Sequence, residues 1–154
     1  MKRWMWILSG LLAVQLLGET GVALENLKPV QLLLVEKQEN RILLKTDLGD
    51  LGRGETVEEA LRDMEMRAEG KIFLETAEQL VLTEDTVMLW QELMSSLRPA
   101  TRVCLGKGEI DPAEAAAYLS YHKGEVTLGR LRADHRKLPV LYAVKGGMKL
   151  VDPR

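Results

Sequence analysis

The sequence of 154 residues predicts an α/β (or α+β) fold, in which a mixed β-sheet carries about three helices. Short apolar runs of strand length alternate along the chain with amphipathic stretches of helical period. Turn residues separate these segments, and the 46% hydrophobic and 29% charged residues are typical of a globular domain. The predicted order of elements is ββ-αβ-αβ-α-ββ, preceded by a signal helix.

A strand pair opens the predicted domain. Residues 30–35 (VQLLLV) are a continuous apolar run, 38–40 (QEN) form a turn cluster, and 41–46 (RILLKT) are the second arm of a hairpin. The apolar centres of both arms predict burial on both faces and therefore a place inside the sheet. Residues 47–54 (DLGDLGRG) are predicted to be a loop, because glycine and aspartate dominate them.

A capped amphipathic helix is predicted over residues 57–69. Thr56 is a suitable N-cap, Glu59 completes a capping box, and Gly70 stands where a left-handed residue ends a helix. Residues 71–74 (KIFL) either extend this helix or form a short strand, and the sequence leaves both open. The apolar face consists of Val57, Ala60, Leu61, Met64 and Ala68.

Two further strand–helix units follow. The strand 79–82 (QLVL) leads to Thr83 as N-cap of a helix that ends before Pro99. The strand 101–105 (TRVCL) leads through a loop at 106–109 to a helix over 111–122. Asp111 caps that helix, Pro112 takes its first position and Glu114 its capping-box position. The apolar face of the helix after Thr83 consists of Val87, Trp90, Leu93, Met94 and Leu97.

The tail from residue 123 is predicted to be β-rich. Residues 125–133 (EVTLGRLRA) alternate polar and apolar side chains, as an exposed strand does. Residues 138–144 and 148–151 are predicted to be two strands around a glycine turn.

The N-terminus has the layout of a secretory signal peptide. A basic start (1–3) precedes an uncharged, largely apolar run (4–18), and small residues at Gly21 and Ala23 suit a cleavage site. An uncleaved membrane anchor is the alternative, with membrane association through residues 4–18. The predicted organisation is therefore a signal peptide or anchor (1–23), an α/β domain (24–122) and a β-rich tail (123–154).

Charge and cysteine content exclude several classes of protein. A net charge of −2 argues against a nucleic-acid binder held by phosphate contacts. Cys104 is the only cysteine, so no internal disulfide, thiolate metal cluster or lipid-modified cysteine after the signal is expected. We expect an exported protein, either secreted or membrane-associated.

The candidate chemical residues each have a simpler structural explanation. His122 and His135 lack the spacings of metal sites. Cys104 lies in an apolar strand, where a free cysteine acts as a small hydrophobe. Residues 106–108 (GKG) follow a strand, but the longer glycine-spaced loop of a phosphate site is missing, which favours a turn.

The remaining candidates are structural as well. Trp90 fits an apolar helical stripe and is predicted to be a core residue. Glu55, Glu58, Glu59, Asp63, Glu65 and Glu69 mostly form a solvated helix face. We therefore predict no catalytic, cofactor-binding or metal-binding residue, no cofactor and no enzymatic activity.

Several motifs recur in the order of a known family. They are a glycine-rich loop before 56–60 (TVEEA), then 71–74 (KIFL), 79–85 (QLVLTED), 97–99 (LRP), 102–105 (RVCL) and the helix 111–122. With these motifs, residues 54–122 resemble the N-terminal domain of the Ger(x)C family, the C subunits of bacterial spore germinant receptors. Residues 138–139 (LP) and 143–151 (AVKGGMKLV) resemble the start of that family's next region. The cysteine that usually follows the signal in this family is missing here, and the match does not extend to the family's further domains.

This resemblance implies a non-enzymatic accessory protein in sporulation or germination. Such a protein acts at the outer face of a spore or cell membrane through contacts with membrane-embedded receptor subunits. The alternative from the sequence is an exported small-ligand binding domain unrelated to germination. A deep apolar pocket with converging polar groups would mark that alternative.

Overall fold

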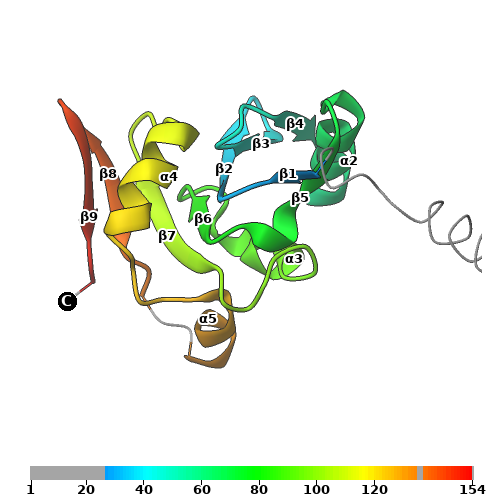
Figure 1. The fold of residues 1–154 in the computed structure, drawn as a ribbon. Helices are drawn as coiled ribbons and strands as arrows, with labels where there is room; N and C mark the ends of the chain where they lie inside the picture. Colours follow the sequence, from blue (N-terminus) through cyan, green and yellow to red (C-terminus); the bar gives the residue numbers. More distant parts are fainter. Residues whose placement is uncertain (1–26, 135–136, 154) are drawn as a thin grey trace, which may run out of the picture.

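The computed structural model describes residues 27–134 and 137–153, and a seven-stranded mixed sheet forms its centre (Figure 1). In their order across the sheet, the strands are β4 (Leu51–Gly54), β3 (Arg41–Thr46), β2 (Leu32–Gln38), β6 (Gln79–Leu82), β7 (Arg102–Lys107), β8 (Val140–Val144) and β9 (Gly147–Val151). The neighbours β2, β6, β7 and β8 run parallel, whereas β3 and β9 are antiparallel to the strands beside them. The predicted mixed α/β class is confirmed.

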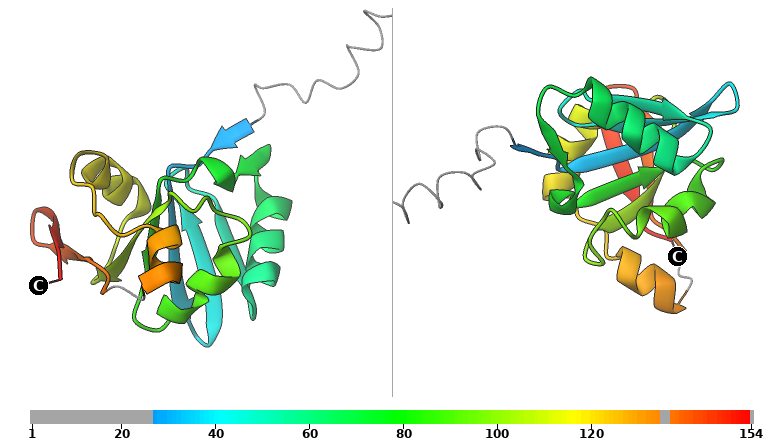
Figure 2. Two further views of the ribbon diagram at one scale, coloured as in Figure 1. Left: turned by 90° about the horizontal axis from the view of Figure 1, so that it is seen from below. Right: turned by 90° about the vertical axis from the view of Figure 1, so that its right-hand side faces the viewer.

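Helices cover both faces of this sheet (Figure 2). On one face lie α2 (Val57–Arg67), the 3-10 turn η3 (Val87–Leu89) with α3 (Trp90–Leu93), and α5 (Leu128–Asp134). On the opposite face lies α4 (Pro112–Tyr121). The buried side chains divide in the same way, and the described part of the chain is therefore a three-layer structure.

The first hairpin lies inside the sheet, as its apolar pattern predicts. Along β2, Leu33 and Val35 join the core under α2, while Leu32 and Leu34 join the core under α4. The turn residues Glu39 and Asn40 have φ angles of 48° and 66°. Two residues in this left-handed region form a tight turn whose twist matches that of the flanking strands.

A second, two-stranded sheet resolves the open prediction for residues 71–74. β5 (Lys71–Phe73) pairs in parallel with β1 (Leu27–Pro29), and the 3-10 turn η2 (Leu74–Thr76) follows directly. The segment is therefore a strand and not an extension of α2.

Two of the three predicted N-caps are confirmed, at Thr56 and Asp111. The Thr56 side chain accepts a hydrogen bond from the N–H of Glu59, and Asp111 accepts one from the N–H of Glu114. The carboxylate of Glu59 reaches back to the N–H of Glu55, 2.9 Å away, which closes the capping box one residue earlier than expected. The predicted helix end is wrong: α2 ends at Arg67 with Ala68 as an extended C-cap, and Gly70, whose φ is 102°, lies in the turn before β5.

The loop predicted over residues 47–54 is wrong in its second half, because β4 begins at Leu51. The glycines that suggested a loop instead admit a close approach of α2 to the strand. A Cβ atom at Gly52 would lie 2.1 Å from the Ala60 carbonyl oxygen, and one at Gly54 would lie 2.5 Å from the Ala60 nitrogen. Glycine here is a packing requirement and not a mark of irregular backbone.

The helix predicted from Thr83 is also wrong in its start and length. Residues 83–86 form a turn, in which the buried Thr86 hydroxyl accepts from the N–H of Thr83 and donates to the carbonyl of Val35. Helical structure begins only at Val87, as a 3-10 turn, and α3 ends at Leu93. The side chain that the sequence predicted as a cap is therefore part of a tertiary turn.

The strand predicted over residues 125–133 is wrong, because this segment contains α5. The side-chain oxygen of Thr127 accepts from the N–H of Arg130, as an N-cap does, and Leu128 and Leu131 are buried one turn apart. A single antiparallel bridge, between Thr127 and Arg102, is the only strand-like pairing of this segment among the described residues. Val126 and Leu128 alternate as in a strand, but the spacing of three between Leu128 and Leu131 is that of a helix and breaks the alternation.

The C-terminal hairpin is confirmed as β8 and β9, which extend the same sheet. Their turn holds Gly146 and Gly147, with φ angles of 94° and 150°. β7 is longer than predicted and includes Gly106 and Lys107, so the loop before α4 starts only at Gly108. The tail from residue 123 thus contributes a helix and two strands to the layers formed by the preceding domain.

Candidate functional site

The candidate histidines form no metal site in the described part of the chain. His122 lies exposed at the end of α4, with its ring stacked on that of Tyr118 at a centroid distance of 4.1 Å. His135 lies outside the described residues. No group of three or more histidine, cysteine or acidic side chains within residues 27–134 and 137–153 is arranged to hold a metal ion.

Cys104 is a buried side chain on the α4 face of β7. Burial raises the pKa of its thiol to about 12. The thiol therefore stays protonated near neutral pH and packs as a small apolar group, since the thiolate is the reactive form.

Residues 106–108 do not form an open phosphate-binding loop, because Gly106 and Lys107 belong to β7. Lys107 pairs with Glu84 at 2.8 Å, which joins the end of β7 to the turn after β6. The hydrogen bond from Lys107 lowers the pKa of the Glu84 carboxyl, and the same bond raises the pKa of Lys107. The Lys107 ammonium group is therefore part of an exposed ion pair at the end of β7.

The acidic side chains around α2 are mostly exposed and serve the helix itself. Glu58 pairs with Arg62 at 2.8 Å, and Asp63 pairs with Arg67 at 2.9 Å. Trp90 is buried, as predicted. None of the helices within the described residues is long and apolar enough to cross a membrane, and the predicted signal lies outside those residues.

The most unusual surface is one side of the β8–β9 hairpin, which we call the hairpin face. Register places Leu105 opposite Val140, Val140 opposite Val151, and Tyr142 opposite Lys149. Because paired residues share a side and alternate residues point the same way, these side chains lie on one side of the sheet. The hairpin face consists of Val140, Tyr142, Val144, Lys149 and Val151.

The hairpin face continues the sheet surface that α2, α3 and α5 cover elsewhere, but these helices do not cover it. Leu105 still packs against that core, whereas Val144 is 49% exposed and Val151 is 40% exposed. On its other side the same hairpin packs towards α4 through Ala143, Met148 and Leu150. One side of the hairpin is therefore part of the core, and the other is apolar and open within the described structure.

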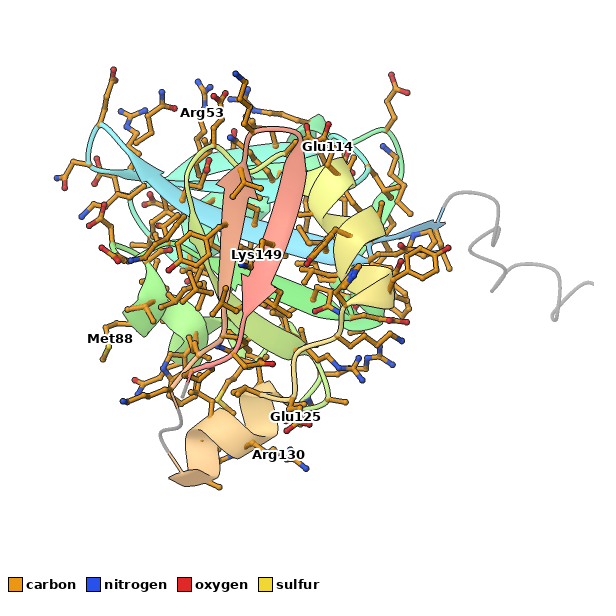
Figure 3. The ribbon with its side chains drawn as sticks, turned by 90° about the vertical axis from the view of Figure 1, so that its left-hand side faces the viewer. Arg53, Met88, Glu114, Glu125, Arg130 and Lys149 are labelled. Carbon is orange, nitrogen blue, oxygen red and sulfur yellow. The ribbon has the colours of Figure 1, made fainter. Side chains whose placement is uncertain are left out.

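An apolar hollow of about 390 Å³ adjoins the hairpin face. Met88, which follows the lining residue Val87 in the sequence, is 70% exposed. Figure 3 shows Met88 on one side of the hairpin and α4 on the other. The hollow adjoins the hairpin face through Leu105, which lines the hollow and is paired with Val140. The hollow is lined by Val87, Trp90, Leu105, Leu131, Lys137, Leu138 and Pro153.

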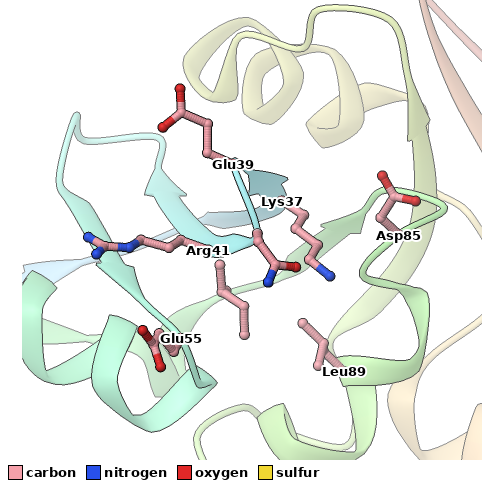
Figure 4. A pocket seen from close by; sticks show the side chains of 8 residues that line it. Lys37, Glu39, Arg41, Glu55, Asp85 and Leu89 are labelled. Atoms are coloured by element: carbon pink, nitrogen blue, oxygen red, sulfur yellow. The ribbon is translucent and has the colours of Figure 1, made fainter.

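A second hollow, of about 550 Å³, lies beside the tip of the first hairpin (Figure 4). Ile42 and Leu89 are its apolar residues. Charged groups of both signs surround them, and within the described residues none of these groups forms an ion pair. The charged residues are Lys37, Glu39, Arg41, Glu55 and Asp85.

Sequence reasoning predicted the strands of the hairpin face but not the face itself. The alternation of Val140, Tyr142 and Val144 was visible, yet whether a helix covers these side chains depends on where α3 and α5 end. α3 is shorter than the predicted helix, and α5 stands where the sequence predicts a strand, so which helices cover the sheet could not be predicted.

Comparisons with protein-family models, with characterised proteins and with solved structures yield no match for this chain.

Proposed function

We propose that this chain is a non-enzymatic, exported protein that acts in sporulation or germination through protein–protein contact at a membrane. In this proposal it corresponds to the N-terminal domain of a Ger(x)C subunit, and its partners are membrane-embedded germinant receptor subunits. The predicted signal or anchor at residues 1–23 would bring it to the outer face of the membrane. The germination role rests on the motif order of residues 54–122.

The mode of action rests on a single structural observation, the hairpin face with its adjoining hollow. Large apolar side chains gathered on one exposed surface usually mark a contact site for another molecule. Val144 and Val151 of this face are exposed, and the hollow beside it is apolar. The candidates for chemistry offer no comparable support, since Cys104 is buried and Lys107 is paired.

Deletion of the gene in its sporulating host tests the germination role. The deletion strain is expected to germinate more slowly on at least one nutrient, measured as loss of optical density and release of dipicolinic acid. Re-expression of the whole chain should restore the rate. Normal germination of the deletion strain with every nutrient would contradict the proposal.

The hollow beside the first hairpin supports a second candidate function, that of an exported small-ligand binding domain. Its apolar centre and unpaired charges of both signs suit a small zwitterion better than a purely apolar ligand. A panel of free amino acids should then raise the melting temperature of the wild-type chain. The same panel should leave a Lys37→Ala/Arg41→Ala variant unchanged. No shift with any compound would remove this candidate.

A further inference from the structure

We infer that the hairpin face docks an amphipathic helix of a partner protein, with acidic residues flanking its apolar stripe. The inference rests on the proposed protein–protein contact but not on a role in germination. Three features of the described structure carry it: the partly occupied edge of β9, the dimensions of the hairpin face and the charge around it.

The edge of β9 is partly occupied, which favours the face over the edge as the site where a partner binds. The N–H of Leu150, which points away from β8, donates to the Tyr118 hydroxyl of α4 at 3.0 Å. An incoming strand would need this N–H for its own hydrogen-bond ladder. Figure 3 shows α4 beside the hairpin.

The hairpin face has the size and character of a seat for a helix. Apolar sheet faces in layered proteins are ordinarily covered by helices, and the rest of this sheet follows that rule. Five residues of β9 span roughly 17 Å at about 3.3 Å per residue. A helix of about eleven residues, or three turns, has the same length. Val144 and Val151 mark the two ends of this seat.

The positive charge on and beside the hairpin face favours an acidic partner over a second copy of this chain. Lys149 lies on the hairpin face, Lys145 at the turn and Lys137 in the lining of the hollow, and all three are exposed. None of the three forms an ion pair with another described residue. Two copies packed through this face would bring like charges together, whereas carboxylates along a helix would complement them.

Site-specific photocrosslinking of the full chain in its native host tests the inference. The photoreactive amino acid p-benzoylphenylalanine replaces Val144. Matched controls carry it at Tyr121 on α4, which is 88% exposed, or at Met66 on α2, which is 74% exposed. The expected result is an adduct from position 144 alone. Its crosslinked peptide should show apolar residues at helical spacing with Asp or Glu beside them.

A charge exchange makes the test specific. A Lys137→Glu/Lys149→Glu variant should lower the adduct yield about tenfold, because repulsion replaces attraction at two contacts. The Lys137→Arg/Lys149→Arg variant should keep the yield. Replacing the acidic residues of the crosslinked partner helix with lysine should restore the adduct yield of the Lys137→Glu/Lys149→Glu variant. Circular dichroism of the purified variants checks that they fold alike.

Four results would overturn the inference. They are an adduct of two copies of this chain, an adduct with residues 1–26 of the same chain, an adduct with a segment that lacks acidic flanks, and no adduct at position 144. The germination proposal fails separately. If the acidic-helix adduct forms and the deletion strain germinates normally, only the germination role is lost.

Discussion

At the residue scale, Thr86 shows how one buried hydroxyl decides where a helix begins. Its Oγ1 atom lies 2.8 Å from the Val35 carbonyl oxygen, 2.9 Å from the Thr83 nitrogen and 3.0 Å from the Thr83 hydroxyl. The side chain is fully buried. These contacts join the end of β2 to the turn after β6, and they hold residues 83–86 out of a helix.

Replacing Thr86 with valine tests this role, because valine keeps the shape and removes the hydroxyl. The Thr83 N–H then keeps only its longer hydrogen bond to the Val35 carbonyl, and that carbonyl loses the hydrogen bond from the hydroxyl. With two hydrogen bonds lost, we expect the free energy of unfolding to fall by about 2 kcal/mol. Urea denaturation measures the change. Thr86→Ser keeps the hydroxyl and is the matched control. Equal stability of the valine and serine variants would show that the hydroxyl has no such role.

At the element scale, the pairing of β4 with α2 determines one end of the sheet. Gly52 and Gly54 let the helix backbone lie directly against the strand. Asp63 of α2 then accepts from the backbone N–H of Arg53 at 2.8 Å and from Arg67 Nε at 2.9 Å. The same glycines that suggested a loop in the sequence therefore create the tightest helix–strand contact of the fold.

A Gly52→Ala variant should be strongly destabilised. The new methyl group would lie 2.1 Å from the backbone oxygen of Ala60, and backbone cannot rotate away as a side chain can. We expect a loss of about 3 kcal/mol, measured by urea denaturation. Arg53→Ala changes an exposed side chain of the same strand and should stay within about 0.5 kcal/mol of wild type. A tolerated Gly52→Ala would mean that α2 does not pack this closely.

Asp63 should make stability depend on acidity. The backbone N–H of Arg53, followed by the hydrogen bond from Arg67, lowers the pKa of this carboxyl below its ordinary value of 3.8. Because the folded pKa is the lower one, the contribution is full above pH 3.8 and is lost as the pH falls through the folded pKa. The difference in urea midpoint between wild type and Asp63→Asn should therefore be largest at neutral pH and vanish in acid.

Glu65→Gln, at an exposed position of the same helix, is the control for the loss of one negative charge. Its urea midpoint should follow that of wild type at every pH. A constant difference between wild type and Asp63→Asn across the acid range would show that the ionised form of Asp63 is not the stabilising one.

Local chemistry explains which elements could be predicted from the sequence. The caps at Thr56 and Asp111 act within four residues, and both helices begin where their caps predict. The turn at residues 83–86, Gly52 and Leu128 depend on distant partners in β2, α2 and the core, so their local patterns were misleading. The hairpin face could not be predicted at all, because exposure depends on the lengths of helices elsewhere in the chain.

At the scale of the whole molecule, a side chain from a neighbouring helix occupies an outward N–H at each edge of the large sheet. The Arg53 N–H of β4 meets Asp63 of α2, and the Leu150 N–H of β9 meets Tyr118 of α4. Sheet edges otherwise present free backbone groups that invite pairing with other chains. Both contacts make their edges less available for pairing, which agrees with our proposal that a partner binds the hairpin face.

Opening the β9 edge should therefore change how the protein associates. Tyr118→Phe keeps the ring on His122 but leaves the N–H of Leu150 without its acceptor. We expect concentration-dependent self-association by edge pairing, measured by sedimentation velocity, with a loss in unfolding free energy of about 1 kcal/mol. Tyr121→Phe, which removes an exposed hydroxyl from the same helix, should remain like wild type in both measurements. If Tyr118→Phe sediments like wild type at every concentration, other features of β9, such as the charge of Lys149, are sufficient to prevent edge pairing.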